Sequence, residues 1–314
     1  LCALRRHLLV MSLASTPDAA TTQGTGADQR RPLKVAFVSP VFLFPADAGG
    51  KIRTGNILRG LKESGQFAVT LLSPATADQQ REWQGELQRL CARFVGWAPS
   101  APRSRWQRAP DLLSSLPINV VADRTPAAVE AVEKALAAER FDVVVFDFVH
   151  AAVLRPKNID GATVCFTHNV EAEIFERHAK TAASAPLRWL WDFQADKMRR
   201  FEREALARFT RVVAVSERDA KKFAADGLAT ARAIPTGVDL DFFSWQAPPD
   251  GAPVVVFTGS MDWEANVDGI RFYIDEVWPQ VRAKVPNALL RVVGKNPPQA
   301  LVQRNVPGVT FTGF

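Results

Sequence analysis

Histidine side chains follow two consecutive apolar runs of the chain, at the point where each run ends. His150 comes three residues after Asp147, the last residue of the run Asp142-Val-Val-Val-Phe-Asp, and His168 directly follows the run from Thr163 to Thr167. A single histidine is most often structural, but two at neighbouring strand ends favour a site, because the carboxyl ends of parallel strands meet at one edge of a sheet. Histidine exchanges protons near neutral pH, so this edge is a candidate for acid–base or electrostatic chemistry.

A glycine pair near the start of the chain could bring backbone close to a ligand. Gly49-Gly50 lies between a β-branched and aromatic run, Lys34 to Ser39, and a helical pattern that begins at Lys51. The free N–H groups of a first helical turn can hold an anion, and here Lys51 and Arg53 would help. A plain tight turn remains the alternative. Neither G-x-G-x-x-G nor G-x-x-x-x-G-K-[ST] is present, so nothing favours a nicotinamide or P-loop site.

Composition and charge set the limits within which these residues act. The chain has 314 residues, of which 47% are apolar and 23% charged, which is ordinary globular material and enough for two domains. The net charge of +6 fits an anionic substrate or a membrane surface. The basic residues are interleaved with acids, so no nucleic-acid partner is expected. Cys2, Cys91 and Cys165 are scattered without C-x-x-C spacing, which favours reduced cytoplasmic thiols over disulfides or zinc.

The elements that must position the histidines alternate between strand and helix. This pattern predicts an α/β fold with parallel sheets. We expect a disordered tail over residues 1–32, a first domain over 33–235, a proline-rich linker over 236–252 and the start of a second domain over 253–314. One crossover and three strands cannot cover both faces of a parallel sheet, so the second domain is expected to be incomplete. The first residues resemble a signal peptide only faintly, and a fragment or a mis-start before Met11 is the favoured interpretation.

Two segments could face a membrane or an acceptor. The loop from Pro99 to Pro110 combines Trp106 with three arginines, and the helix expected from Leu187 to Phe209 is basic and amphipathic. A solvated loop with one anchored tryptophan and a solvated helix with local ion pairs are the alternatives, because Asp192, Asp196, Glu202 and Glu204 dilute the positive face.

Several motifs in order resemble family 4, or group 1, glycosyltransferases, and most closely those found with exopolysaccharide and exosortase-linked gene clusters. In the first domain they are F-V-S-P…P-A-D-A-G-G-K-I-R-T, T-H-N-V-E from Thr167, A-V-S-E-R-D from Ala214 and P-T-G-V-D from Pro235. In the second they are the run G-S-M-D-W-E-A-N-V-D-G from Gly259, L-L-R-V-V-G-K-N-P-P from Leu289 and the closing V-T-F-T-G-F. The resemblance covers essentially all of the chain from Leu33 to Phe314.

The resemblance implies a GT-B architecture of two Rossmann-like domains, and an enzyme that retains anomeric configuration without a metal or other cofactor. The donor would be a nucleotide-diphosphate sugar, and the acceptor a glycan or lipid-linked glycan in exopolysaccharide or cell-surface polysaccharide synthesis. It implies His150 as the residue beside the transferred sugar, with Asp147 and His168 as weaker matches. Donor or phosphate contacts are implied at seven positions: Gly49, Gly50, Arg53, Gly259, Ser260, Asn266 and Lys295.

Departures from the family pattern leave alternatives open. Ser260 stands in the turn where the family commonly carries a basic residue, and the family's two-glutamate donor motif would lie beyond Phe314, so the chain by itself is expected to bind donor poorly. A nucleotide-sugar epimerase or hydrolase of the same fold, and a non-catalytic partner, are the other functions considered. Asp239 and Asp241 spell D-x-D, but a linker position disfavours a metal site there. The expected location is the cytoplasm, and peripheral contact with the inner face of the plasma membrane stays open.

Overall fold

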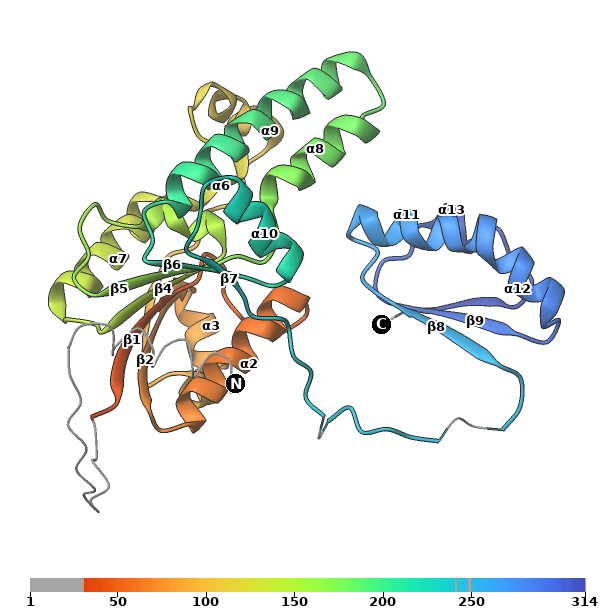
Figure 1. Ribbon diagram of the computed structural model, residues 1–314, viewed down its shortest axis with the longest axis horizontal. Coiled ribbons are helices and arrows are strands. Elements are labelled where there is room, and N and C mark those ends of the chain that lie inside the picture. The colour runs from red at the N-terminus through yellow and green to blue at the C-terminus, as the bar shows by residue number, and fades with distance from the viewer. Residues whose placement is uncertain (1–30, 241, 248–249, 314) are drawn as a thin grey trace. The chain divides into compact units, whose positions relative to one another are not determined.

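The computed structural model describes residues 31–240, 242–247 and 250–313, and the chain divides into two compact units, Leu1–Gly237 and Val238–Phe314 (Figure 1). Each unit is described by itself. The tail expected over residues 1–32 falls outside the described residues except for Arg31 and Pro32, and so does Asp241 of the D-x-D sequence.

The first unit is built on a seven-stranded parallel sheet with the order β3-β2-β1-β4-β5-β6-β7. Its strands are β1 (Leu33–Val38), β2 (Phe67–Pro74), β3 (Arg93–Trp97), β4 (Val143–Asp147), β5 (Ala162–Phe166), β6 (Arg211–Ala214) and β7 (Ala231–Ala233). The chain moves outward from β1 to β3, returns to β4 and continues outward to β7. This reversal between β1 and β4 is the place where open α/β sheets usually bind ligands.

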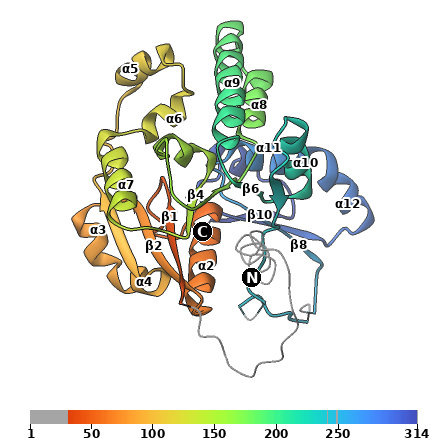
Figure 2. The ribbon, with the colours of Figure 1, turned by 60° about the vertical axis from the view of Figure 1, so that its left-hand side comes forward.

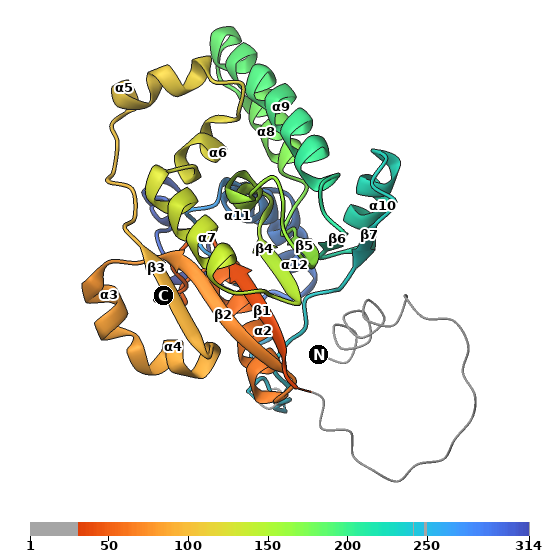
Figure 3. The same cartoon turned by 90° about the vertical axis from the view of Figure 1, so that its left-hand side faces the viewer.

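Helices cover the sheet on both faces, as parallel strands require. The helices of the first unit are α2 (Gly49–Glu63), α3 (Ala77–Glu82), α4 (Gln84–Leu90), α5 (Arg105–Arg108), α6 (Ile118–Asp123), α7 (Pro126–Ala138), α8 (Glu171–Thr181), α9 (Ala185–Leu206) and α10 (Glu217–Ala225). It also has the 3-10 turns η1 (Ala109–Leu113) and η2 (Val149–Leu154). One buried cluster joins α7, α9 and α10 to one face, and another joins α2 and α4 to the other (Figure 3).

The central strand β4 shows why the sheet forms where it does. All five of its residues are buried; Val144 and Phe146 belong to one cluster, and Val143 and Val145 to the other. A continuous β-branched and aromatic run fits a strand that is covered on both sides.

Side-chain hydrogen bonds at the N-cap residue mark where two of the helices begin. The sequence Thr125-Pro126 predicts a helix start, and the Thr125 side chain accepts a hydrogen bond from the Ala128 N–H with Pro126 at the first helical position. Ser216 is predicted to start the next helix, and it caps α10 by accepting from the Asp219 N–H. Helix α2 differs, because its N-cap residue Ala48 has no capping side chain. The N-cap residue of α2 therefore gives no side-chain acceptor to the N–H groups of the first turn.

Several sequence-based expectations were wrong in detail. The sequence pattern predicts one helix over 77–90, but the structure breaks it at Trp83 into α3 and α4. The predicted Pro99–Pro110 loop contains the short helix α5, which is held by a capping box. The amphipathic pattern of 187–209 predicts Lys197 and Glu202 on the solvent side of α9, but both are buried. Each of these two charged groups has polar partners from another segment, which the helical pattern alone does not show.

Helices α8 and α9 form a hairpin that extends beyond the sheet (Figures 1 and 2). Phe175 of α8 and Ala195 and Met198 of α9 share a small buried cluster with Val120 of α6. The far end of the hairpin, from Ala183 to Trp189, is exposed.

The second unit contains a three-stranded parallel sheet with the order β10-β9-β8. Its elements are β8 (Val254–Thr258), α11 (Glu264–Phe272), the π-helical turn η3 (Tyr273–Val277), α12 (Trp278–Lys284), β9 (Leu289–Val293), α13 (Gln299–Val302) and β10 (Val309–Gly313). The helix predicted over 267–284 therefore has a π-helical turn in its middle. Its core centres on Ile270, Trp278 and Leu290, and exposure alternates along β8, so one face of this sheet is open.

Candidate functional site

Asp147, at the end of β4, connects three segments at the carboxyl edge of the first sheet. The Thr54 hydroxyl of α2 donates to Asp147 Oδ2 at 2.8 Å, and His168 Nε2 lies 2.8 Å from Asp147 Oδ1. The carboxylate is buried. It therefore fixes both the first turns of α2 and the imidazole that follows β5.

Gly50 lies against this imidazole. A Cβ atom built on Gly50 would come 3.4 Å from His168 Nδ1 and 3.6 Å from Cε1, so a side chain there would lie in contact with the imidazole. When Nε2–H donates to Asp147, the lone pair of Nδ1 faces the start of α2. The glycine pair and His168, which are far apart in sequence, thus form one surface.

Arg53 supplies a positive charge beside the same carboxylate. Its guanidinium carbon lies 4.2 Å from the centre of the Phe166 ring, and its Nη1 is buried without a hydrogen-bond partner among residues 31–240, 242–247 and 250–313. Burial lowers the pKa of Arg53 to about 10, against the opposing charge of Asp147. The group remains protonated at neutral pH, with one N–H edge available to an anion.

His150 lies next to His168 across a strained residue. Phe148 has φ of 76°, unusual for a large side chain, and its ring centre lies 4.5 Å from the ring of His150 and 5.3 Å from that of His168. His150 and His168 thus gather around one aromatic ring.

Two carboxylates surround His150. Nδ1 lies 3.3 Å from Asp123 Oδ2, and Nε2 lies 3.6 Å from Glu171 Oε2, which is an ion-pair distance and too long for a hydrogen bond. Burial alone lowers the pKa of a histidine, but Asp123 and Glu171 outweigh it and raise the pKa of His150 to about 9. His150 is therefore a cation at neutral pH.

Glu202 anchors the helix that carries Glu171. Its carboxylate accepts the backbone N–H groups of Glu171 at 2.8 Å and of Ala172 at 3.2 Å, at the start of α8. Burial is the main reason that the pKa of Glu202 rises to about 7, although the two N–H groups favour the charged form. The carboxylate of α9 thereby holds the Glu171 side chain near His150.

The structure brings six predicted residues of the first unit to one edge: His150, Asp147, His168, Gly49, Gly50 and Arg53. Their assignment to a donor or to catalysis stays a prediction. Sequence reasoning missed Thr54, Asp123, Glu171 and Glu202. Glu202 could have been found, because it falls on the buried stripe of α9 that includes Met198 and Ala205.

The four predicted residues of the second unit also lie close together, at the ends of β8 and β9. Asn266 Nδ2 donates to the Ser260 carbonyl at 2.7 Å, and the N–H of Met261 donates to the carbonyl of Lys295 at 3.0 Å. Gly259 is needed because a Cβ there would come 2.8 Å from Asn266. The Lys295 ammonium lies 3.6 Å from Asp262, so its charge is partly balanced within the turn.

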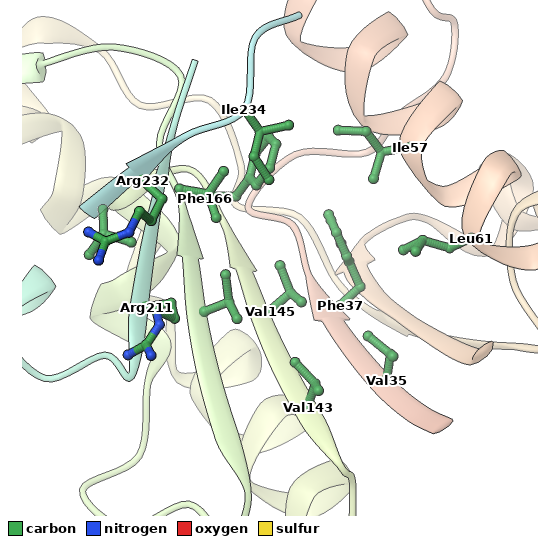
Figure 4. Close-up of a pocket in the computed structure, with 13 residues that line it drawn as sticks. Val35, Phe37, Ile57, Leu61, Val143, Val145, Phe166, Arg211, Arg232 and Ile234 are labelled. Atoms are coloured by element: carbon green, nitrogen blue, oxygen red, sulfur yellow. The ribbon is translucent and has the colours of Figure 1, made fainter. Parts of the chain in front are cut away.

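An apolar groove on the first sheet lacks the convergent polar groups that would bind a sugar. Figure 4 shows Val143, Val145, Phe37 and Ile57 lining it, with arginines only on one side. Sugar recognition needs convergent polar groups, and His150, Asp147 and His168 at the strand ends provide them.

Within the described ranges no group of three or more His, Cys, Asp or Glu could hold a metal ion, and no helix is long and apolar enough to cross a bilayer.

Comparison with known sequences gives two consecutive matches. A family described as Glycosyltransferase Family 4 matches residues 48–242, and one described as Glycosyl transferases group 1 matches residues 252–314. None of the curated proteins matches the chain.

Solved structures of glycosyltransferases share the fold. A sucrose-phosphate synthase from Thermosynechococcus elongatus is 16% identical with a TM-score of 0.60, over 90% of this chain and 70% of that one. TarM is 7% identical (TM-score 0.58; 90% and 76%), and the catalytic domain of starch synthase IV from Arabidopsis thaliana, bound to ADP and acarbose, is 13% identical (0.53; 90% and 74%). These likenesses confirm the predicted GT-B type of α/β fold.

Proposed function

The chain belongs to glycosyltransferase family 4, whose pattern matches well over half of its length, and on this premise we propose that it moves a sugar from a nucleotide-diphosphate donor to a glycan or lipid-linked acceptor. Retention of anomeric configuration, independence from metal and a role in exopolysaccharide or cell-surface polysaccharide synthesis are parts of this proposal. So is a cytoplasmic location, with the acceptor presented at the inner face of the plasma membrane.

One observation carries the proposal: the start of α2 lies directly against the His168–Asp147 pair. Because Gly50 has no side chain, the backbone at this helix start lies next to His168 Nδ1 with no Cβ between them. A diphosphate held at that helix start would therefore place its sugar beside an imidazole. This is the arrangement that a transfer reaction needs, because the leaving group and the reacting carbon are adjacent.

The residues of the first unit fit the charges that develop during transfer. Departure of a nucleotide diphosphate builds negative charge, which the first-turn N–H groups of α2 and the unpaired Nη1 of Arg53 can stabilise. These groups supply the positive field that a metal supplies in other enzymes. Donor binding by the Gly259–Ser260 turn, Asn266 and Lys295 of the second unit is a separate part of the proposal and is based on the family resemblance.

The two histidines suit different roles in this proposal. His150 is protonated at neutral pH, since its pKa is about 9, so it can donate a proton or hold charge but cannot serve as a base there. His168, oriented through Asp147, presents Nδ1 to the helix start. We therefore assign His168 to the reacting sugar and His150 to electrostatic support, with Asp147 as the positioning residue.

The test is nucleotide release by the natural protein that carries this chain, with a panel of nucleotide sugars, in the presence and absence of a glycan or lipid-linked acceptor. Gly50→Val should lower turnover roughly 10²-fold or more at an unchanged unfolding midpoint, because the new side chain occupies the space beside His168. Gly55→Ala is the matched control in the same helix, since a Cβ there meets nothing within 4 Å.

Three results would contradict the proposal. Wild-type turnover by Gly50→Val would remove the helix start from the site. Turnover that needs no acceptor would identify a hydrolase or epimerase of this fold, and a natural protein that binds no nucleotide sugar would be a non-catalytic partner.

A further inference from the structure

Three large apolar side chains are exposed together near the far end of the α8–α9 hairpin. Leu113 is 91% exposed, Trp189 68% and Phe193 41%. We call these three residues the tip patch. Single exposed apolar residues are common on soluble proteins, whereas a cluster that includes two aromatic rings marks an interaction surface.

Contacts hold the tip patch in place. Trp189 and Phe193 are one helical turn apart on α9, and their rings are stacked with centres 5.7 Å apart and an interplanar angle of 0°. The buried Lys197, one turn further on, lies 4.3 Å from the centre of the Phe193 ring. Its ammonium donates to the two carbonyl oxygens that flank Leu113, at 2.8 and 2.5 Å. A loop distant in sequence is thereby fastened beside the two rings.

The charge of the hairpin end is mainly positive. From Arg177 to Trp191 the chain carries three basic side chains, those of Arg177, Lys180 and Arg188, and the first acid after them is the exposed Asp192. All three basic side chains are exposed, and none has an ion-pair partner within the described part of the chain. Further along α9, Asp196 pairs with Arg199 and Glu202 is buried, whereas Glu204 is exposed.

We propose that the tip patch and its basic surroundings dock the protein onto an anionic lipid bilayer. Tryptophan and phenylalanine favour the boundary between headgroups and acyl chains, and basic side chains favour anionic headgroups. The combination fits a bilayer better than a second copy of the chain, which would bring the same positive charge into contact with itself. The role of this docking rests on the proposed function, because it would bring the first unit to a lipid-linked acceptor.

Vesicle sedimentation of the natural protein tests the surface directly. We expect it to bind vesicles of phosphatidylglycerol and phosphatidylcholine, and to bind pure phosphatidylcholine vesicles much less. The Trp189→Ser/Phe193→Ser variant should lower the partition coefficient roughly tenfold or more. Arg177→Gln/Lys180→Gln/Arg188→Gln should remove the preference for the anionic lipid. Phe272→Ser, which removes an exposed aromatic ring of the second unit, is the matched control and should bind like the wild type.

A second measurement does not depend on the folding of the serine variant. Phosphatidylglycerol with brominated acyl chains quenches tryptophan fluorescence at short range, so the wild-type protein should be quenched on binding. Trp189→Phe keeps an apolar ring, and it should keep binding while losing most of the quenching.

Several outcomes would overturn the inference: no vesicle binding by the wild type, equal binding by the serine variant, or unchanged quenching in Trp189→Phe. A change from dimer to monomer in the serine variant, without an effect on vesicles, would assign the patch to a contact between copies instead. Transfer to a water-soluble acceptor should be unchanged in the serine variant. Patch-dependent vesicle binding without any sugar transfer would leave the docking surface standing and remove the proposed function alone.

Discussion

The two sheets of this protein share a strand-to-helix connection, but they differ in how far their faces are covered by helices. In each unit the first strand leads through a loop into a helix, which begins at Gly49 in the first unit and follows the turn at Gly259 in the second. Strand β4 of the first unit is buried along its whole length, whereas β8 of the second alternates between exposed and half-buried residues. Coverage of both faces forces polar groups at the strand ends of the first unit to find partners within the protein.

Two carboxylates show what this difference does to acid–base chemistry. Burial raises the pKa of Glu202 to about 7, while hydrogen bonds from Asn296 and Ser260 are the main reason that the pKa of the exposed Asp262 lies below its usual value. The pKa values of these two carboxylates therefore shift in opposite directions. The first unit can therefore bring the pKa of a carboxylate near neutral pH, whereas the second carries a carboxylate that stays charged at neutral pH.

The largest effect should come from the core of the covered sheet. Phe146 of β4 is fully buried, and Phe146→Ala should lower the free energy of unfolding by about 3–5 kcal/mol, from lost burial and the cavity left behind. Val256 of β8 is 55% exposed, so Val256→Ala should cost less than about 1 kcal/mol. Urea unfolding followed by circular dichroism measures both. Equal losses would show that the two sheets are not covered differently.

The pH dependence of stability should separate the buried cluster from the rest. His150 binds its proton more tightly in the folded state, since its pKa rises from 6.5 to about 9. Its stabilising effect is therefore complete below pH 6.5 and is lost as the pH rises through 9, a change of up to about 3 kcal/mol. In His150→Gln this fall between pH 7 and 9.5 should be absent, as measured by urea unfolding at each pH. The same fall in the variant would mean that another group causes it.

The smallest effect should come from the exposed turn of the second unit. Asp262 has a lowered pKa, so its contribution to stability is present above its usual pKa of 3.8 and is lost only as the pH falls through the lowered value. At pH 7, Asp262→Asn should leave the urea midpoint unchanged, because the side chain is exposed and asparagine can still accept from Asn296. A shift as large as that of Phe146→Ala would show that this turn is as tightly coupled as the buried site.

Much of the first sheet could be predicted from local sequence. The β-branched run of β4 and the apolar run of β5 predicted two neighbouring buried strands, and the structure confirms that His150 and His168, which follow them, meet around Phe148. The glycine pair was predicted as a turn before a helix that begins at Lys51, but α2 begins at Gly49, so both glycines belong to its first turn. These features depend on residues that are close in sequence, where periodicity and turn chemistry are informative.

The partners of the histidines could not be predicted in the same way. Asp123 belongs to α6, a helix that no strong pattern indicated, and Glu202 reaches the site from α9. Both approach through tertiary packing. Only Glu202 had a local signal, its place on the buried stripe of α9, and this signal competed with the expectation that a glutamate in a charged helix faces water. Lys197 was misjudged for the same reason, because its partners are the carbonyl groups beside Leu113.

Helix α9 of the hairpin also fixes the distance between the tip patch and the residues around His150. Trp189 and Glu202 are thirteen residues apart on one continuous helix, a span of about 20 Å at the α-helical rise. Once Trp189 rests on a lipid surface, the side chains around His150, which Glu202 supports through the start of α8, lie at about this length along the hairpin from the headgroups. An acceptor whose growing end projects by one short oligosaccharide could therefore reach them while its lipid stays in the bilayer.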